Sequence, residues 1–306
     1  MSPSGSAEGM ARLRRAVAGI EAGAGRGHRA PRRLKLARAL DSALGGGLAD
    51  DALHEIAPAE PADGAAAMGF ALALAARFLS QRPSAGLVIG EGFAAHETGA
   101  LYGPGLIAHG LTLSRLVFVE APDADAAFWA MEEALKSGGP AAVIGEIWNL
   151  RGYSLAASRR LLLAARKGRT PALLVLASAY GQAERMSSAA ETRFEIAALP
   201  SARIPAAAGR DLPGPFACGA RLVKARLTVF VDAVDSPSKD GRPSGRPMDR
   251  VRAQRARLHD AAHAVRLEWR SENLAFHEDL AFDDPPISLS LAAASGDGPR
   301  PASQPR

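Results

Sequence analysis

The sequence has very few cysteine and aromatic residues. Cys218 is the single cysteine among 306 residues, which excludes a disulfide within one chain and fits a reducing, cytoplasmic compartment. Aromatic side chains make up only 5%, and we attribute this to a base composition that favours Ala and Arg. Hydrophobic residues nevertheless reach 47%, so the chain has the apolar material that a globular core needs.

The sequence also lacks a long uninterrupted apolar run. The longest, Ala65 to Leu79, is short for a membrane span and contains Arg77, so we expect no transmembrane helix. The N-terminal region has basic residues but no continuous apolar segment, and no secretory signal is expected.

Positive charge is concentrated at the N-terminus. Residues 1–38 contain nine Arg or Lys and two Glu, a net charge of +7, whereas the whole chain carries +5. The remaining residues are therefore slightly acidic. The basic segment is either a contact region for nucleic acid or an acidic partner, or a solvated leader.

A further absence concerns the connection from Ala57 to Met68. It follows an apolar strand that ends at Ile56 and precedes an Ala-rich helix, as a phosphate-binding loop would. A working loop needs glycines, a Lys and a Ser or Thr, because these wrap the phosphates, neutralise them and hold magnesium. The connection has no Lys, Ser or Thr. Asp63 and Gly64 mark the degenerate phosphate-loop position, and Glu60 and Asp63 add negative charge there.

Short apolar runs of strand length alternate with helical segments along most of the chain. We predict the strands at 53–56, 86–90, 116–120, 141–146 and 172–176, and the helices at 34–44, 64–79, 124–137 and 154–167. Such alternation is typical of a doubly wound α/β fold, a mainly parallel sheet with helices on both faces. From Glu191 onward, strands at 192–199 and 221–231 follow without a helix, which predicts a C-terminal antiparallel edge.

This pattern predicts three parts. Residues 1–38 form a basic N-terminal arm with a short helix, residues 39–234 the core, and residues 235–306 an Arg- and Pro-rich C-terminal extension with a disordered tail. Within the extension, residues 249–269 are compatible with a helix.

Seven short motifs carry a family resemblance. In order they are Leu40-Asp41-x-x-Leu44-Gly45-Gly46-Gly47-Leu48, His54-Glu55-Ile56, Gly69-Phe70-Ala71-Leu72-Ala73, Tyr102-Gly103-Pro104-Gly105-Leu106, Trp129-Ala130-x-Glu132-Glu133-Ala134-Leu135, Ser158-Arg159-Arg160-Leu161 and Ala190-Glu191-Thr192-Arg193-Phe194. The set resembles the ImuA family, RecA-fold relatives encoded with ImuB and an error-prone C-family DNA polymerase. The likeness covers roughly residues 39–231, with a fainter trace at Leu267-Glu268-Trp269.

The resemblance implies a RecA-like core and a non-catalytic accessory role in SOS-induced mutagenesis, by translesion DNA synthesis. The implied partners are an ImuB-type Y-family polymerase homologue, the C-family polymerase and RecA. No cofactor, metal or membrane is implied. Two alternatives remain open: a DNA-stimulated ATPase or recombinase relative, and a SulA-like inhibitor of cell division.

A more distant likeness to RecA assigns positions to two carboxylates. Glu91 ends a strand where RecA-type ATPases carry the carboxylate that activates water, and Glu146 ends the strand of the magnesium-associated carboxylate. Without a phosphate cradle we expect neither to be catalytic. The loop from Ser178 to Arg193 corresponds to a DNA-contacting loop in RecA relatives. Together with the basic arm and an Arg-rich C-terminal run, it supplies the candidate DNA or partner contacts Arg12, Arg14, Arg15, Arg32, Arg33, Arg185, Arg193, Arg250 and Arg252.

Two further patterns have simpler interpretations. His259 and His263 are one helical turn apart, as in a zinc motif, but Asp260 replaces the usual Glu and a third ligand is not identifiable. The segment Gly152-Tyr153-Ser154-Leu155-Ala156 resembles a nucleophile elbow without its second glycine. Ser154 is accounted for as the N-cap of a helix.

Overall fold

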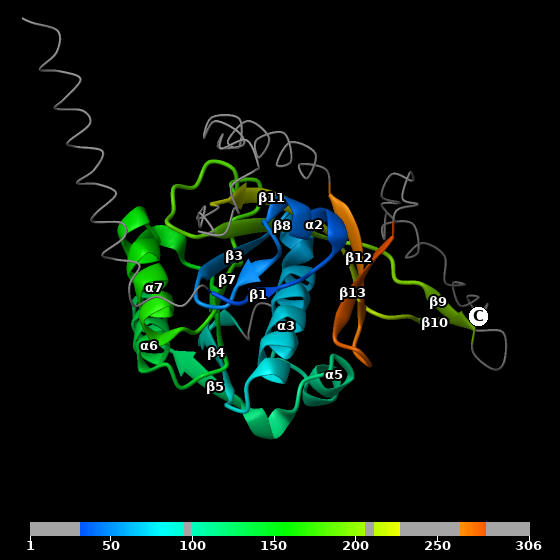
Figure 1. The fold of residues 1–306 in the computed structure, drawn as a ribbon, viewed down its shortest axis with the longest axis horizontal. Helices are drawn as coiled ribbons and strands as arrows, with labels where there is room; N and C mark the ends of the chain where they lie inside the picture. The colour runs from blue at the N-terminus through cyan, green and yellow to red at the C-terminus, as the bar shows by residue number, and fades with distance from the viewer. Residues whose placement is uncertain (1–30, 95–98, 206–210, 227–263, 280–306) are drawn as a thin grey trace, which may run out of the picture.

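The computed structural model describes residues 31–94, 99–205, 211–226 and 264–279, and its centre is a nine-stranded sheet (Figure 1). The strands are β3 (Leu53–Pro58), β4 (Gly86–Glu91), β5 (Leu116–Ala121), β6 (Ala142–Ile147), β7 (Ala172–Leu176), β8 (Thr192–Ala198), β11 (Ala217–Ala225), β12 (Val265–Arg270) and β13 (Ala275–Asp279). Their spatial order is β13-β12-β11-β8-β3-β7-β6-β4-β5. β3, the first of these strands in the chain, therefore lies at the middle of the sheet.

The sheet combines a parallel and an antiparallel part. The pairs from β8 through β3, β7, β6 and β4 to β5 are all parallel. The pairs β8–β11, β11–β12 and β12–β13 are antiparallel. The predicted mainly parallel α/β sheet with a C-terminal antiparallel edge is confirmed. The order differs from both common doubly wound orders, in which the first strand neighbours the second or the third.

Helices cover both faces of the sheet. One face carries α3 (Gly64–Gln81), together with α2 (Arg38–Ala43) and α5 (Gly103–Ala108), and the other carries α6 (Ala124–Ser137) and α7 (Leu155–Gly168). Figure 1 shows α6 and α7 packed side by side. Each face thus has its own apolar cluster, and the central strands β3, β6 and β7 are buried on both sides.

The central helix α3 is apolar enough to resemble a membrane span. Its most apolar window is 72% buried inside the protein, and twelve of its eighteen residues are buried. Packing against the sheet accounts for this composition. The start of α7 follows the predicted signal: Ser154 Oγ accepts a hydrogen bond from Ala157 N (3.2 Å), so Ser154 is the N-cap of α7.

Smaller elements complete the structure. The short helices are η2 (Pro61–Asp63), η3 (Leu113–Arg115) and η4 (Leu150–Gly152). Two-stranded ribbons form from β1 (Arg33–Leu34) with β2 (Leu48–Ala49) and from β9 (Arg203–Pro205) with β10 (Asp211–Pro213). Gly47 between β1 and β2 has φ +119°, and a Cβ there would lie 2.3 Å from Leu34 O. The turn therefore requires glycine at this position.

Four predictions of extent need correction. The helix predicted over 34–44 is shorter, because Leu34 pairs with Leu48 in a ribbon and only 38–43 are helical. The boundary at residue 38 divides the core, since Leu34 and Leu36 are buried in it. The boundary at residue 234 divides the sheet, since β12 and β13 belong to it. Residues 265–269, predicted as helix-compatible, form a strand, and residues 249–263 lie outside the described residues.

Candidate functional site

The carboxyl end of β3 is where a bound phosphate would lie. Its connection to α3 contains η2, and the Asp63 carboxylate is used within it. Asp63 Oδ2 accepts a hydrogen bond from Glu60 N (3.0 Å), and Asp63 Oδ1 accepts one from Ala198 N at the end of β8 (2.8 Å). Asp63 occupies the N-cap position of α3, but its side chain does not cap that helix. The carboxylate instead closes the turn and ties it to β8.

Gly64 has no feature that would demand a glycine. Its φ and ψ are −54° and −44°, the ordinary right-handed helical values, and a Cβ there would have no atom within 4 Å. In a phosphate cradle the glycine lets backbone N–H groups approach the ligand closely. Neither the backbone conformation nor the surroundings of Gly64 require a glycine. Exposed Glu60, four residues earlier, adds negative charge near this position.

Glu91 at the end of β4 binds backbone rather than facing an open site. Its side chain is buried, and its Oε1 accepts hydrogen bonds from Trp148 N (2.7 Å) and Asn149 N (3.0 Å). These two N–H groups follow the end of β6. Glu91 therefore holds the turn after β6 in place, which is a structural use of a carboxylate.

Glu146, near the end of β6, lies on the strand next to that of Glu91 and opposite Gly90. Its Oε1 accepts a hydrogen bond from Trp148 Nε1 (3.4 Å). Burial raises the pKa of the Glu146 carboxyl, and the nearby Glu91 charge raises it further. Among the described residues, no cluster of three or more His, Cys, Asp or Glu side chains could hold a metal ion.

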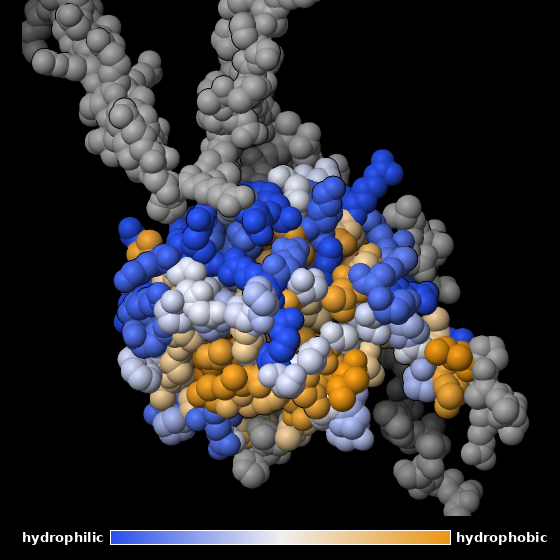
Figure 2. All heavy atoms as spheres, turned by 60° about the horizontal axis from the view of Figure 1, so that its bottom comes forward, coloured by the Kyte–Doolittle hydropathy of each residue, from blue (hydrophilic) through white to orange (hydrophobic). Residues whose placement is uncertain are grey.

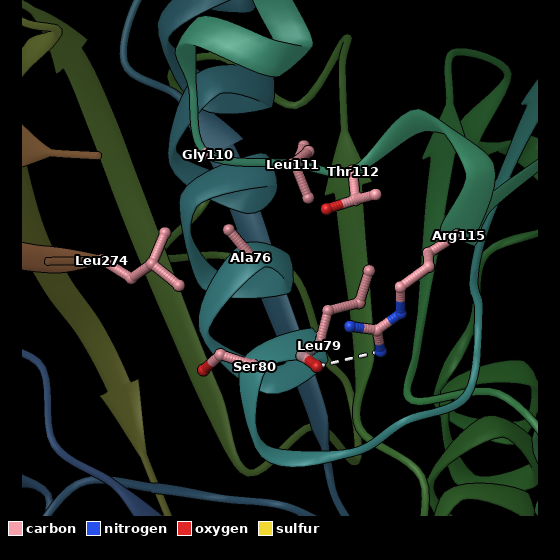
Figure 3. Close-up of a pocket in the computed structure, with 8 residues that line it drawn as sticks. All are labelled: Ala76, Leu79, Ser80, Gly110, Leu111, Thr112, Arg115 and Leu274. Carbon is pink, nitrogen blue, oxygen red and sulfur yellow. Dashed lines mark hydrogen bonds between the residues drawn. The ribbon is translucent and has the colours of Figure 1, made fainter. Parts of the chain in front are cut away.

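A cavity of about 140 Å³ lies at the opposite end of α3 from the phosphate-loop position. Figure 3 shows its lining, which includes Ala76, Leu79, Thr112, Arg115 and Leu274. Arg115 Nη2 donates to Leu79 O (2.9 Å), Ser84 O (2.6 Å) and Arg82 O. This guanidinium satisfies carbonyl groups at the carboxyl end of α3, which is a favourable position for a cation.

A buried polar cluster lies beside the connection from β7 to β8, residues 177–191, which we call the crossover. Arg193 Nε donates to Glu55 Oε2 (2.5 Å), and the two side chains are 1% and 0% exposed. Tyr153 Oη donates to the other oxygen of Glu55. Burial and the Glu55 charge raise the pKa of Tyr153 above its ordinary range, so its hydroxyl stays protonated. Glu55 is thus a buried carboxylate with two strong donors.

Arg193 also fixes the crossover itself. Its guanidinium donates to Met186 O (2.8 Å), Ser188 Oγ (3.0 Å) and Ala183 O. Lys224 on β11 donates from Nζ to Ser188 O (2.7 Å) and Ser188 Oγ (2.9 Å). Burial lowers the pKa of the Lys224 amine to about 8. The crossover is therefore anchored to the sheet by two cations and one carboxylate.

The structure corrects one candidate contact and places three others. Arg193 is buried, so it is not a surface contact for DNA, because its donors are bound to Glu55 and the crossover. Arg185 and Arg32 are exposed. Arg33 donates to Leu44 O (3.2 Å) and Gly47 O (2.9 Å), so it closes the glycine turn. The remaining candidates, Arg12, Arg14, Arg15, Arg250 and Arg252, lie outside the described residues.

The structure thus separates the candidate residues rather than gathering them. Asp63 and Gly64 follow β3, whereas Glu91 and Glu146 lie on β4 and β6, with β7 between them and β3. The sequence reasoning missed the cluster of Glu55, Tyr153, Arg193, Ser188 and Lys224. The sequence did carry a signal: Glu55 lies in a predicted strand of a parallel sheet, where strands are covered on both faces, and a charge buried in this way needs a partner.

Comparison with known proteins identifies no family for this chain. No protein-family model matches it, and no curated protein matches it. Solved structures similar to it include SulA from Pseudomonas aeruginosa, with 20% identity over 40% of this chain and 96% of that chain, at a TM-score of 0.33. They also include the RadB recombinase, with 19% identity over 62% of this chain and 89% of that chain, at a TM-score of 0.39. Both TM-scores are low, so the fold class stated above rests on the strand order and pairing.

Proposed function

We propose that this chain is a RecA-fold accessory protein that turns over no nucleotide and acts through protein contacts in damage-induced translesion DNA synthesis. The proposed partners are an ImuB-type Y-family polymerase homologue, an error-prone C-family polymerase and RecA, in the cytoplasm. The motif order that resembles the ImuA family supports this assignment. So does the strand, turn and helix at the phosphate-loop position, which keeps the local architecture of a nucleotide site.

The hydrogen bonds of the Asp63 carboxylate are the main support for the proposal that the protein turns over no nucleotide. Its two oxygens bind Glu60 N and Ala198 N, and thereby place negative charge beside the first turn of α3. A phosphate in that position would meet like charge without a lysine to neutralise it. Glu91, the counterpart of a water-activating carboxylate, is bound to two backbone N–H groups. Both features favour a scaffold over an ATPase.

Exposed apolar side chains on the helical face support a role in protein contacts. Trp129 on α6 is 67% exposed, and Leu155 and Leu163 on α7 are also exposed. Aromatic residues are enriched in protein interfaces, and Trp is among the residues that contribute most to binding there. We therefore place one partner contact on the outer face of α6 and α7.

Co-purification tests the proposal. The full chain is expressed with an ImuB-type protein and a C-family polymerase, and the retained proteins are identified. We expect both to be retained, and we expect Trp129→Glu to weaken retention of one of them by at least about tenfold, as for an interface anchor. Asn273→Glu, which adds the same charge at an exposed position in the β12–β13 turn, away from α6 and α7, is the matched control. Retention of neither protein, with capture of the cell-division machinery instead, would favour the SulA-like alternative.

A further inference from the structure

The cavity at the carboxyl end of α3 combines an apolar wall with one charged side chain. Ala76 and Leu79 of α3, Leu111 of the loop after α5, and Leu274 of the β12–β13 turn form the apolar wall (Figure 3). Of the described residues that line the cavity, only Arg115 is charged. Figure 2 brings forward the side of the molecule where α3 ends and shows a broad apolar area there. These surroundings suit an apolar group with an anionic end.

The guanidinium of Arg115 has donors that the protein does not use. Its hydrogen bonds to Leu79 O, Arg82 O and Ser84 O all come from Nη2. Nε is buried without an acceptor among the described residues, Nη1 donates no hydrogen bond to them, and no described carboxylate pairs with this cation. Figure 3 shows the end of the guanidinium directed toward Leu79 and the cavity. Because unused donors and an unpaired charge are unfavourable in a partly buried place, the cavity favours an anionic ligand.

The wall across the cavity from Arg115 depends on an uncommon backbone conformation. Leu274 has φ 50°, a left-handed value that bulky residues rarely adopt. Its side chain packs against Gly110, where φ is +88° and an added Cβ would lie 2.6 Å from Leu274 Cδ2. The loop after α5 and the β12–β13 turn therefore meet with no side chain of residue 110 between them. Backbone strain of this kind often occurs where a ligand binds.

The size of the cavity limits the ligand to a small molecule. Its volume is about 140 Å³, and an apolar cavity of about 150 Å³ in another protein binds benzene. The apolar part of a ligand here therefore has roughly four to six carbon atoms. Ser80 and Thr112 in the lining are exposed, so the cavity opens to solvent and a ligand can enter from there.

The groups around Arg115 determine the charge of the ligand. Carbonyl groups at the carboxyl end of α3 lie beside the guanidinium and carry partial negative charge. With a single cation present, a monoanion is favoured over a dianion such as phosphate. We propose that this cavity binds a small aliphatic monocarboxylate. Its carboxylate accepts hydrogen bonds from Arg115 Nη1 and Thr112 Oγ1, and its chain contacts the leucine side chains of the wall.

An NMR titration of the isotope-labelled full chain with pentanoate tests this proposal. We expect saturable shifts of the backbone amide signals of Leu111, Thr112 and Leu274. The Kd should be about 1 mM or below, which is ordinary for a ligand of about seven non-hydrogen atoms. Pentanamide has the same shape without the charge, and acetate has the charge with almost no apolar chain. Each should bind at least about tenfold more weakly than pentanoate.

A cavity-filling variant separates ligand binding from the structural contacts of Arg115. Ala76→Leu fills the cavity with a larger side chain and keeps Arg115, so it should lose pentanoate binding while its circular dichroism stays native. Ala156→Leu, the same change at an exposed position on α7, is the matched control and should bind normally. Thr112→Val keeps the shape of an exposed side chain and removes its hydroxyl, and it should weaken binding about three- to tenfold.

Three results would overturn the proposal. The first is the absence of saturable pentanoate binding. The second is equal binding of pentanoate and pentanamide, which would indicate an apolar site that does not recognise charge. The third is unchanged binding by the Ala76→Leu protein, which would place the ligand elsewhere. Nucleotide and polymerase partners do not enter this measurement, so its failure leaves the proposed function untouched.

Discussion

Strand β3 and the turn that follows it use polar side chains in two different ways. In its amino half, His54 and Glu55 are fully buried, and both have close polar partners. At its carboxyl end, exposed Glu60 and partly exposed Asp63 bind backbone groups of a surface turn. The first group holds neighbouring strands and the crossover together, and the second closes the position where a nucleotide would bind. The difference in burial predicts a large difference in the energetic consequence of mutation.

Breaking the buried ion pair should have the largest effect. Arg193→Met leaves Glu55 without its cation in the core, and we expect the free energy of unfolding to fall by about 3–5 kcal/mol. Urea denaturation measures this loss. The double variant Glu55→Leu with Arg193→Met should recover most of it, because the uncompensated charge is then removed. A loss below about 1 kcal/mol in the single variant would contradict the burial of this pair.

The buried histidine should make the amino half of β3 sensitive to acid. His54 contacts Thr192 Oγ1 (2.8 Å) and Ala49 O (2.8 Å), and burial lowers its pKa from 6.5 to about 4. The unfolded chain therefore binds a proton at a higher pH than the folded chain does, and stability falls as pH falls from about 6.5 to about 4. The expected loss from this group is about 3 kcal/mol. Urea midpoints at several pH values should show a smaller loss for His54→Gln.

At the carboxyl end the effects should be smaller. Asp63→Ala frees Glu60 N and Ala198 N, but these groups lie near solvent and can bind water. We expect a loss of about 1 kcal/mol in the free energy of unfolding. If Asp63→Ala lowered the free energy of unfolding as much as Arg193→Met does, the two ends of β3 would not differ in their contribution to stability.

Gly64→Ala is expected to act in the opposite direction. The backbone at Gly64 is helical and a Cβ there would meet no neighbour, so the substitution should raise the free energy of unfolding by about 0.5–1 kcal/mol. Thermal denaturation measures the gain. A destabilised variant would indicate that another group lies closer to Gly64 than the structure shows, so that a side chain there is not tolerated.

The parallel part of the fold could be predicted from the sequence, because its strands are short apolar runs with clear boundaries. Ala172 to Leu176 and Ala124 to Ser137 have the predicted limits. The β12–β13 hairpin could not be predicted in this way. Its alternating residues in Val265-Arg266-Leu267-Glu268-Trp269 follow an Arg-rich stretch that is compatible with a helix, and pairing with β11, about forty residues earlier, decides its structure.

The sequence alone shows that the residues of a phosphate-binding loop are missing from the candidate site. It does not show which contacts are formed there instead. The missing Lys and hydroxyl between Ala57 and Met68 are visible in the sequence. The contact of Asp63 with Ala198, and that of Glu55 with Arg193, join residues more than 130 positions apart. Such contacts depend on the order of the strands, which local patterns do not determine.

We propose that the carboxyl end of β3 has the strand, turn and helix arrangement of a nucleotide site but does not bind nucleotide. A calorimetric titration of the full chain with ATP and magnesium, with and without single-stranded DNA, tests this most directly. We predict no saturable binding at concentrations up to about 1 mM, where the binding free energy would be only about −4 kcal/mol. Magnesium-dependent binding at micromolar ATP, weakened by Gly64→Ala, would contradict it.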